Sequence, residues 1–193
     1  MISLLLPLLA TAELLNLPRW IPQHSFSLGL EPTVIFASHL APTSGVGTAI
    51  KLQWVHGYTD LSNVMLNIGT GNGPYGWQLG GGMTFDFFAD NQNGPGAGLA
   101  LTARFLRLPS GLSFEPALVP YVHKTLKTNS IPIEPYLAVP TNLSLSNGRY
   151  STLVTLVLGS YFHHTQTLVT SCELGVSLSN ATTYFSGGLT YYH

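Results

Sequence analysis

The sequence predicts an all-β protein: an antiparallel up-and-down transmembrane β-barrel of about ten strands. Only 8% of the 193 residues are charged, against roughly a quarter in an ordinary soluble domain. The longest apolar runs, such as residues 2–10, fall short of the ~20 residues that a membrane-spanning helix requires. In residues 77–87, apolar Trp77, Leu79 and Phe85 instead alternate with small or polar neighbours. Successive side chains of a strand point to opposite faces, so this pattern predicts one lipid-facing and one lumen-facing side.

Ten segments carry this pattern between turns rich in Gly, Pro, Asn and Ser. In chain order the predicted strands are 24–40, 47–56, 61–69, 76–88, 98–108, 112–123, 131–145, 150–162, 167–179 and 183–192. The clearest turns are 57–60, 71–74, 91–95, 109–111, 146–148 and 179–181. Pro32 or Pro42 can split the first segment, and Pro135 or Pro140 the seventh. Single-chain bacterial barrels use even strand numbers, so eight and twelve are the alternatives to ten.

The alternation recurs in strand after strand, and the content of its polar face distinguishes a barrel from a soluble β-sandwich. The second, third, fifth and ninth segments place apolar residues at 50, 52 and 54; 64, 66 and 68; 101, 103 and 105; and 174, 176 and 178. A sandwich shows the same period, but its polar face meets bulk water and usually carries many charges. Here that face holds mainly Gly, Ser, Thr, Asn and Gln, which suits a narrow interior. Residues 153–158 depart from the pattern because they are apolar on both faces.

The first twelve residues have the features of an export signal. An apolar stretch leads to Ala10-Thr11-Ala12, which matches a small-residue cleavage site, although no Lys or Arg precedes it. A buried N-terminal segment is the alternative interpretation. We therefore expect a signal peptide at 1–12, a lead-in segment at 13–23 and the barrel domain at 24–193.

The chain resembles the small outer-membrane β-barrel proteins of Gram-negative bacteria. The resemblance covers most of residues 24–193 as a pattern and is most specific in the last strand, where that family carries a signal for the barrel-insertion machinery. The corresponding residues are a polar residue, a glycine, an aromatic residue and the chain end: Ser186, Gly188, Tyr191 and His193. The family's terminal aromatic is replaced here by His193. The resemblance implies an exported protein of the bacterial outer membrane, with membrane lipid and the insertion machinery as partners.

Charged and amide side chains fall on predicted inward positions, where they would line the lumen. The predicted lumen-lining residues are Lys51, Gln53, Asn67, Gln78, Asp86, Arg104, Glu115, Glu134 and Glu173. Either they pair and plug the barrel, or they line a water-filled channel. Side chains can largely fill an interior of about ten strands, so we favour the plug. The expected role is structural, or that of a passive pore for a small solute.

Nothing in the sequence points to an enzyme, a cofactor, a metal site or a nucleic-acid partner. The formal net charge is −1, and the single cysteine, Cys172, excludes an intrachain disulfide. The seven histidines lie mostly at predicted strand ends, and His163-x-Thr165 is the nearest approach to the His-hydroxyl pair of a lipid-modifying enzyme. The alternatives to a passive barrel are therefore a lipid-modifying outer-membrane barrel enzyme and a soluble secreted β-sandwich binding module.

Three further expectations concern side-chain placement. An outward set should face lipid: Trp54, Leu66, Trp77, Leu79, Phe85, Leu101 and Phe105. Aromatic residues near strand ends should form girdles at the two membrane interfaces: Trp20, Tyr58, Tyr75, Tyr121, Tyr150, Tyr161, Tyr191 and Tyr192. A tight turn at 109–110 pairs Leu108 with Gly111, and this register sets Arg104 opposite Glu115 as an interior ion pair.

Overall fold

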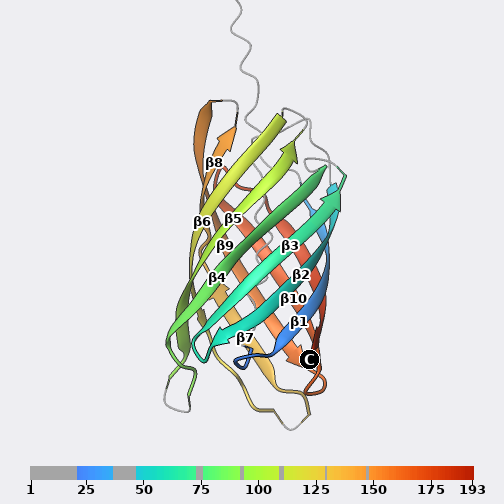
Figure 1. The fold of residues 1–193 in the computed structure, drawn as a ribbon, viewed down its shortest axis with the longest axis vertical. Helices are drawn as coiled ribbons and strands as arrows, with labels where there is room; N and C mark the ends of the chain where they lie inside the picture. Colours follow the sequence, from blue (N-terminus) through green and yellow to red (C-terminus); the bar gives the residue numbers. More distant parts are fainter. Residues whose placement is uncertain are drawn as a thin grey trace, which may run out of the picture.

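The computed structural model of the chain (Figure 1) describes residues 21–36, 47–72, 76–91, 94–108, 111–128, 130–146 and 148–193. Its strands are β1 (Phe26–Ile35), β2 (Gly47–Thr59), β3 (Ser62–Gly71), β4 (Trp77–Phe88), β5 (Gly96–Leu108), β6 (Gly111–His123), β7 (Ile133–Ala138), β8 (Thr141–Ser146), β9 (Arg149–His163), β10 (Leu168–Ser179) and β11 (Tyr184–Tyr192). Each predicted segment corresponds to one strand, except the seventh, which corresponds to two. The strands that extend one to three residues beyond the predicted bounds are β2, β3, β5, β6, β8 and β9. The expected signal peptide, most of the lead-in and residues 37–40 of the first segment lie outside the described residues. No helix in the described ranges is long and apolar enough to span a membrane.

The sheet closes on itself as an antiparallel barrel. Neighbouring strands pair in chain order, and the last strand, β11, pairs with the first, β1. β7 and β8 lie in line between β6 and β9 and together fill one position. The barrel therefore has ten strand positions, as the sequence predicts. The strands tilt relative to the long axis of the barrel (Figure 1).

Proline explains the interruption at the seventh position. Between β7 and β8, Pro140 has no N–H to give to the ladder, while its carbonyl accepts from Thr155 N at 3.1 Å. Val139 N donates to the carbonyl of Pro120 at 3.1 Å across the gap. Of the two prolines that the sequence suggested, Pro140 makes the break, whereas Pro135 sits within β7 opposite Ser160.

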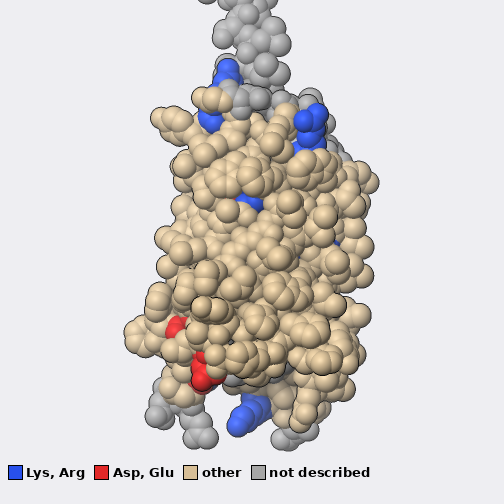
Figure 2. Space-filling model, viewed as in Figure 1, with Lys and Arg blue, Asp and Glu red and all other residues tan. Residues whose placement is uncertain are grey.

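Inward and outward positions alternate along the strands as the sequence predicts. In β1, Glu31 is 2% exposed whereas its neighbour Leu30 is 45% exposed. All seven residues of the outward set lie on the outer face: Leu66, Trp77, Leu79, Leu101 and Phe105 are exposed, and Trp54 and Phe85 are half-buried. On the face that Figure 2 shows, the side wall has few charged atoms; Lys and Arg lie towards both ends, and Asp and Glu towards the lower end.

The predicted aromatic girdles are wrong in part. Tyr58, Tyr150 and Tyr191 are exposed, but Tyr161 is 6% exposed and belongs to the interior cluster. Tyr121 and Tyr192 also pack against that cluster. The side of the barrel that a strand residue faces is set by its place in the alternation, and all three occupy inward positions. Trp20 and Tyr75 lie outside the described residues.

Candidate functional site

The barrel interior holds several buried charged and titratable groups, and we treat it as the candidate site. All nine predicted lumen-lining residues occupy inward positions. Asn67 and Asp86 are half-buried, and the remaining seven are buried: Lys51, Gln53, Gln78, Arg104, Glu115, Glu134 and Glu173. The charged residues among them form contacts at three levels along the axis. The barrel has a terminal end, where Phe26 and His193 meet, and an opposite, far end.

Near the far end, Arg104 of β5 pairs with Glu115 of β6. The strand register sets the two residues directly opposite each other and Leu108 opposite Gly111, which confirms the predicted hairpin register. Arg104 Nη2 and Nε donate to the same carboxylate oxygen, Glu115 Oε2, at 2.8 and 3.1 Å. Gly111, which follows the turn, has a φ of 138° that disfavours other residues.

At mid-height, an ion pair joins β1 to β2. Lys51 Nζ lies 2.7 Å from Glu31 Oε2, and the two side chains are 3% and 2% exposed. Glu31 was missed at the sequence level. It was detectable, because it has the inward parity of Ser27 and Thr33 and lies directly opposite Lys51 in the ladder. Next to it, Thr33 Oγ1 donates to Ser186 Oγ at 3.0 Å, which joins β1 to β11.

A second mid-height group centres on the buried carboxylate of Glu173 in β10. The hydroxyls of Tyr136 and Tyr184 each donate to one of its oxygens at 2.5 Å. Each ring lies across a glycine on the neighbouring strand: Tyr136 faces Gly159 and Tyr184 faces Gly175 in the ladder. A Cβ on either glycine would come within 2.1 Å of the tyrosine ring.

These glycines create the space in which the inward aromatic rings lie flat. The same arrangement recurs at the terminal end of β5, where a Cβ on Gly98 would meet Tyr121 and one on Gly96 would meet His123. This role was missed at the sequence level. Its signal was present as an inward glycine directly opposite an inward aromatic residue, a pairing in which the ring compensates for the missing side chain of the glycine.

The terminal end carries a cluster of histidines and carboxylates from four strands. Glu134 of β7 lies between two histidines: His123 Nδ1 is 2.9 Å from Oε1 and His163 Nε2 is 3.2 Å from Oε2. His123 Nε2 lies 3.9 Å from Asp86 Oδ2, and the Tyr121 hydroxyl donates to Asp86 Oδ1 at 2.5 Å. Among the described residues, no three His, Cys, Asp or Glu side chains are arranged to hold a metal ion.

Outside the strands, Asp90 ties two turns of the terminal end together. Its carboxylate accepts from Thr125 N at 2.6 Å and lies 3.0 Å from Lys124 Nζ. Burial acts to raise the pKa of Asp90, but the hydrogen bonds from Thr125 and Lys124 and the lysine charge outweigh it and lower the pKa. The contact therefore contributes stability above the ordinary carboxyl pKa and loses it as the pH falls through the lowered value.

We expect a carboxyl NMR titration of Asp90 to give a midpoint below the ordinary aspartate value of about 3.9. The amide resonance of Thr125 should shift with the same midpoint, because its N–H donates to this carboxylate. In Asp90→Asn the Thr125 shift should no longer titrate. A midpoint at or above the ordinary value would show that the contact is absent in solution.

His163 and Thr165, the nearest approach in the sequence to the His-hydroxyl pair of a lipid-modifying enzyme, contact different partners. His163 faces the interior and contacts Glu134, whereas Thr165 bonds to the turn backbone at Leu168. The adjacent His164 instead places Nε2 at 2.8 Å from Thr170 Oγ1 on an exposed surface. Within the described residues no carboxylate contacts His164, so this pair lacks the third member of a hydrolytic triad.

The proposed insertion-signal residues lie in β11 and just after it. Ser186 is buried, and Gly188 faces the interior close to Ser171, whose Oγ a Cβ would meet at 2.3 Å. Tyr191 is exposed on the outer face. His193 is the last residue and stacks on Phe26 of β1 with ring centroids 4.9 Å apart.

No protein-family model and no curated protein matches the chain. Among solved structures, an outer membrane channel from Pseudomonas putida F1 is 10% identical with a TM-score of 0.51, over 93% of this chain and 99% of that chain. LpxR from Salmonella typhimurium is 8% identical with a TM-score of 0.46, over 86% and 99%. The translocator domain of the autotransporter NalP from Neisseria meningitidis is 9% identical with a TM-score of 0.41, over 88% and 87%. The likeness to the channel shows a shared fold, that of the outer-membrane β-barrels. This fold confirms the resemblance seen in the sequence.

Proposed function

We propose that this protein is an exported barrel of the bacterial outer membrane with a structural role, whose plugged lumen passes at most a small solute. The observation that carries the proposal is the division of the wall into an apolar outside and a charged inside. Exposed Leu, Ile and Phe side chains cover the outer face, while the ion pairs Glu31–Lys51 and Arg104–Glu115 are buried within. Strands of about 9–11 residues suffice to cross a membrane as a barrel, and β1 to β6 have 10 to 13 residues.

The closed topology argues against the alternative of a soluble β-sandwich. In a sandwich, the apolar faces of two sheets meet in a shared core. Here most of the large apolar side chains point away from the enclosed space, and their exposure would be costly in water. Such a continuous exposed apolar surface is expected where lipid replaces water as the solvent.

The packing of the interior supports a plug over a water-filled channel. Inward residues at several heights, such as Leu106, Val119 and Val157, are 0% exposed. A continuous aqueous channel would leave its wall accessible to water, so full burial at these positions favours an interior filled by side chains. The partners we propose are accordingly membrane lipid and, through the last strand, the barrel-insertion machinery. A catalytic role is not part of the proposal, since the His164–Thr170 contact is incomplete.

Membrane location can be tested by fractionating cells that express the full chain and by running unboiled and boiled samples in detergent gels. We expect the protein in the outer-membrane fraction, with a faster band before boiling that disappears after it. Recovery in the aqueous fraction without detergent would overturn the proposal in favour of a secreted soluble protein.

We expect the wild-type barrel to give no resolvable open-channel steps in planar bilayers. Tyr136 and Tyr161 stack within the interior, with ring centroids 5.1 Å apart. Replacing both with alanine removes the bulk of two buried rings, so the double variant should show discrete conductance steps. Tyr150→Ala is the matched control because Tyr150 is exposed, and it should stay silent. Wild-type steps as large as those of the double variant would show an open lumen.

A further inference from the structure

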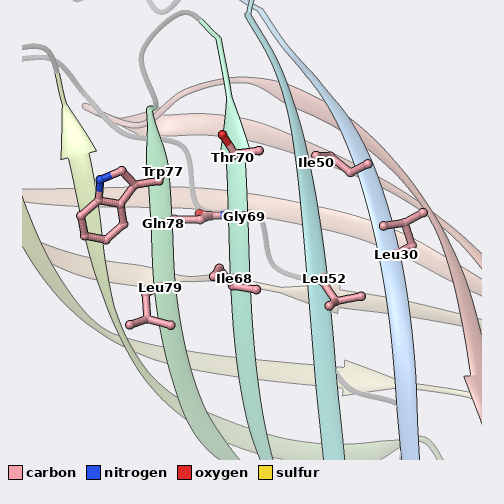
Figure 3. A pocket seen from close by; sticks show the side chains of 9 residues that line it. All are labelled: Leu30, Ile50, Leu52, Ile68, Gly69, Thr70, Trp77, Gln78 and Leu79. Carbon is pink, nitrogen blue, oxygen red and sulfur yellow. The ribbon is translucent and has the colours of Figure 1, made fainter.

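The outer face carries one concave apolar area between β1 and β4 (Figure 3). Leu30, Ile50 and Leu52 border it on one side, and Trp77 and Leu79 on the other. The volume of this open groove is about 540 Å³. In the ladder, Ile50 lies opposite Thr70 and Thr70 lies opposite Trp77. The small Thr70 therefore separates two large side chains in one row, which explains the hollow.

The groove changes from apolar to polar at the far end of the barrel. Thr48 lies two residues beyond Ile50 on the same face of β2, and its Oγ1 and backbone N both lie within hydrogen-bond distance of Asn72 Oδ1, at 3.2 and 2.8 Å. The Thr70 hydroxyl donates to the carbonyl of Gly76 at 2.9 Å. The apolar part of the groove matches the acyl chain of a lipid molecule, and the polar edge matches its headgroup.

Arg107 of β5 lies at the level of this polar edge, beside Trp77. Gly76 N donates to the carbonyl of Arg107 at 2.9 Å, which sets Arg107 beside the first residue of β4, Trp77. Arg107 is exposed and lies opposite the exposed Leu112, whereas its neighbour Leu106 is buried, so its side chain is on the outer face. In the described part of the chain Arg107 makes no ion pair, and all described carboxylates lie inside the barrel or at the terminal end. The edge is therefore complementary to an anion.

We propose that this groove binds one acyl chain of an anionic glycerophospholipid whose phosphate lies against Arg107. The inference rests on the proposed membrane location. Trp77 fits the same arrangement, because its indole ring has an apolar body for the chain and an N–H donor for the headgroup region. An arginine forms charge-assisted hydrogen bonds with phosphate oxygens, while the apolar groove excludes a headgroup from its interior.

The experiment measures quenching of Trp77 by brominated acyl chains. The full chain carrying Trp20→Phe and Trp54→Phe retains Trp77 as its single tryptophan. This variant is reconstituted in phosphatidylcholine vesicles that contain the same mole fraction of either brominated phosphatidylglycerol or brominated phosphatidylcholine. We expect the occupancy derived from quenching to be about fivefold higher for phosphatidylglycerol, the preference that one arginine near an anionic headgroup provides.

Two substitutions test the parts of the site separately. Arg107→Gln should reduce the phosphatidylglycerol preference to about one, whereas the matched control Arg149→Gln, at another exposed arginine of the far end, should retain it. Thr70→Phe should fill the groove and lower quenching by both lipids while the heat-dependent gel shift is kept.

The outcomes separate this inference from the proposed function. Equal quenching by both lipids in the Trp77-only protein, or equal loss of preference in Arg107→Gln and Arg149→Gln, would overturn the lipid site and leave a membrane barrel. No quenching by either lipid would overturn the membrane location and the lipid site with it.

Discussion

Replacing Glu115 by alanine is expected to lower the free energy of unfolding by about 3–5 kcal/mol, because it leaves the Arg104 guanidinium buried without its carboxylate. Glu115 is 1% exposed and Arg104 is 9% exposed, so bulk water reaches neither group well. Arg104→Ala should lower the free energy of unfolding by a similar amount, because it leaves the Glu115 carboxylate buried without the guanidinium. The measurement is urea-induced unfolding in lipid vesicles, followed by tryptophan fluorescence.

The double-mutant cycle gives the sharper result. If the two charges interact as the 2.8 Å contact indicates, the double variant should be less destabilised than the sum of the single variants. Arg149→Ala, at an exposed position, serves as the control and should change stability by less than about 0.5 kcal/mol. Additive single effects would show that the pair does not contribute as a unit.

The second large effect is expected at Gly159, where even a methyl group has no room. A Cβ there would lie 2.1 Å from Cζ of Tyr136, so Gly159→Ala must push the ring off its site. Overpacking of this kind costs about 1–3 kcal/mol. Displacing the Tyr136 hydroxyl from Glu173 adds the loss of a buried hydrogen bond, which is worth about 0.5–1.5 kcal/mol.

Gly187→Ala is the matched control for this substitution. Gly187 lies in β11, and a Cβ there would come no nearer than 3.9 Å to Ser171 O. The unfolding curve of Gly187→Ala should therefore stay close to that of the wild type. Combining Gly159→Ala with Tyr136→Ala should relieve the overlap and cost less than the sum of the two. Equal stability of Gly159→Ala and Gly187→Ala would contradict the proposed ring-on-glycine packing.

The alternation of apolar and polar residues was enough to predict the barrel, because the side that a strand residue faces depends only on its parity. The same rule, combined with one tight turn, also predicted the Arg104–Glu115 register. The prediction was wrong where residue type took precedence over parity. Tyr161 was assigned to an interfacial girdle for its amphipathic ring, yet its parity places it inside.

Contacts between side chains that are not directly opposite each other in the ladder were not predicted from the sequence. Glu134 lies opposite Tyr161 in the ladder, yet its carboxylate meets His123 of β6 and His163 of β9, the two strands that pair with β7. Residues 153–158, apolar on both faces, looked like a departure from the pattern. In the barrel, Leu153 and Val157 face a packed interior and are buried, so an apolar inward residue is what this part of the lumen requires.

The seam between β1 and β11 has a consequence for how the molecule forms. Ser27 pairs with Tyr192 and Thr33 with Ser186, so the contacts that close the ring join residues more than 150 positions apart. Contacts this distant in sequence raise the contact order, and the entropy of closing so long a loop slows folding. Until the last strand has left the ribosome, the first strand has no partner on one edge. Closure is therefore a post-translational event, and the unpaired edge of β1 must be shielded from other chains until β11 arrives.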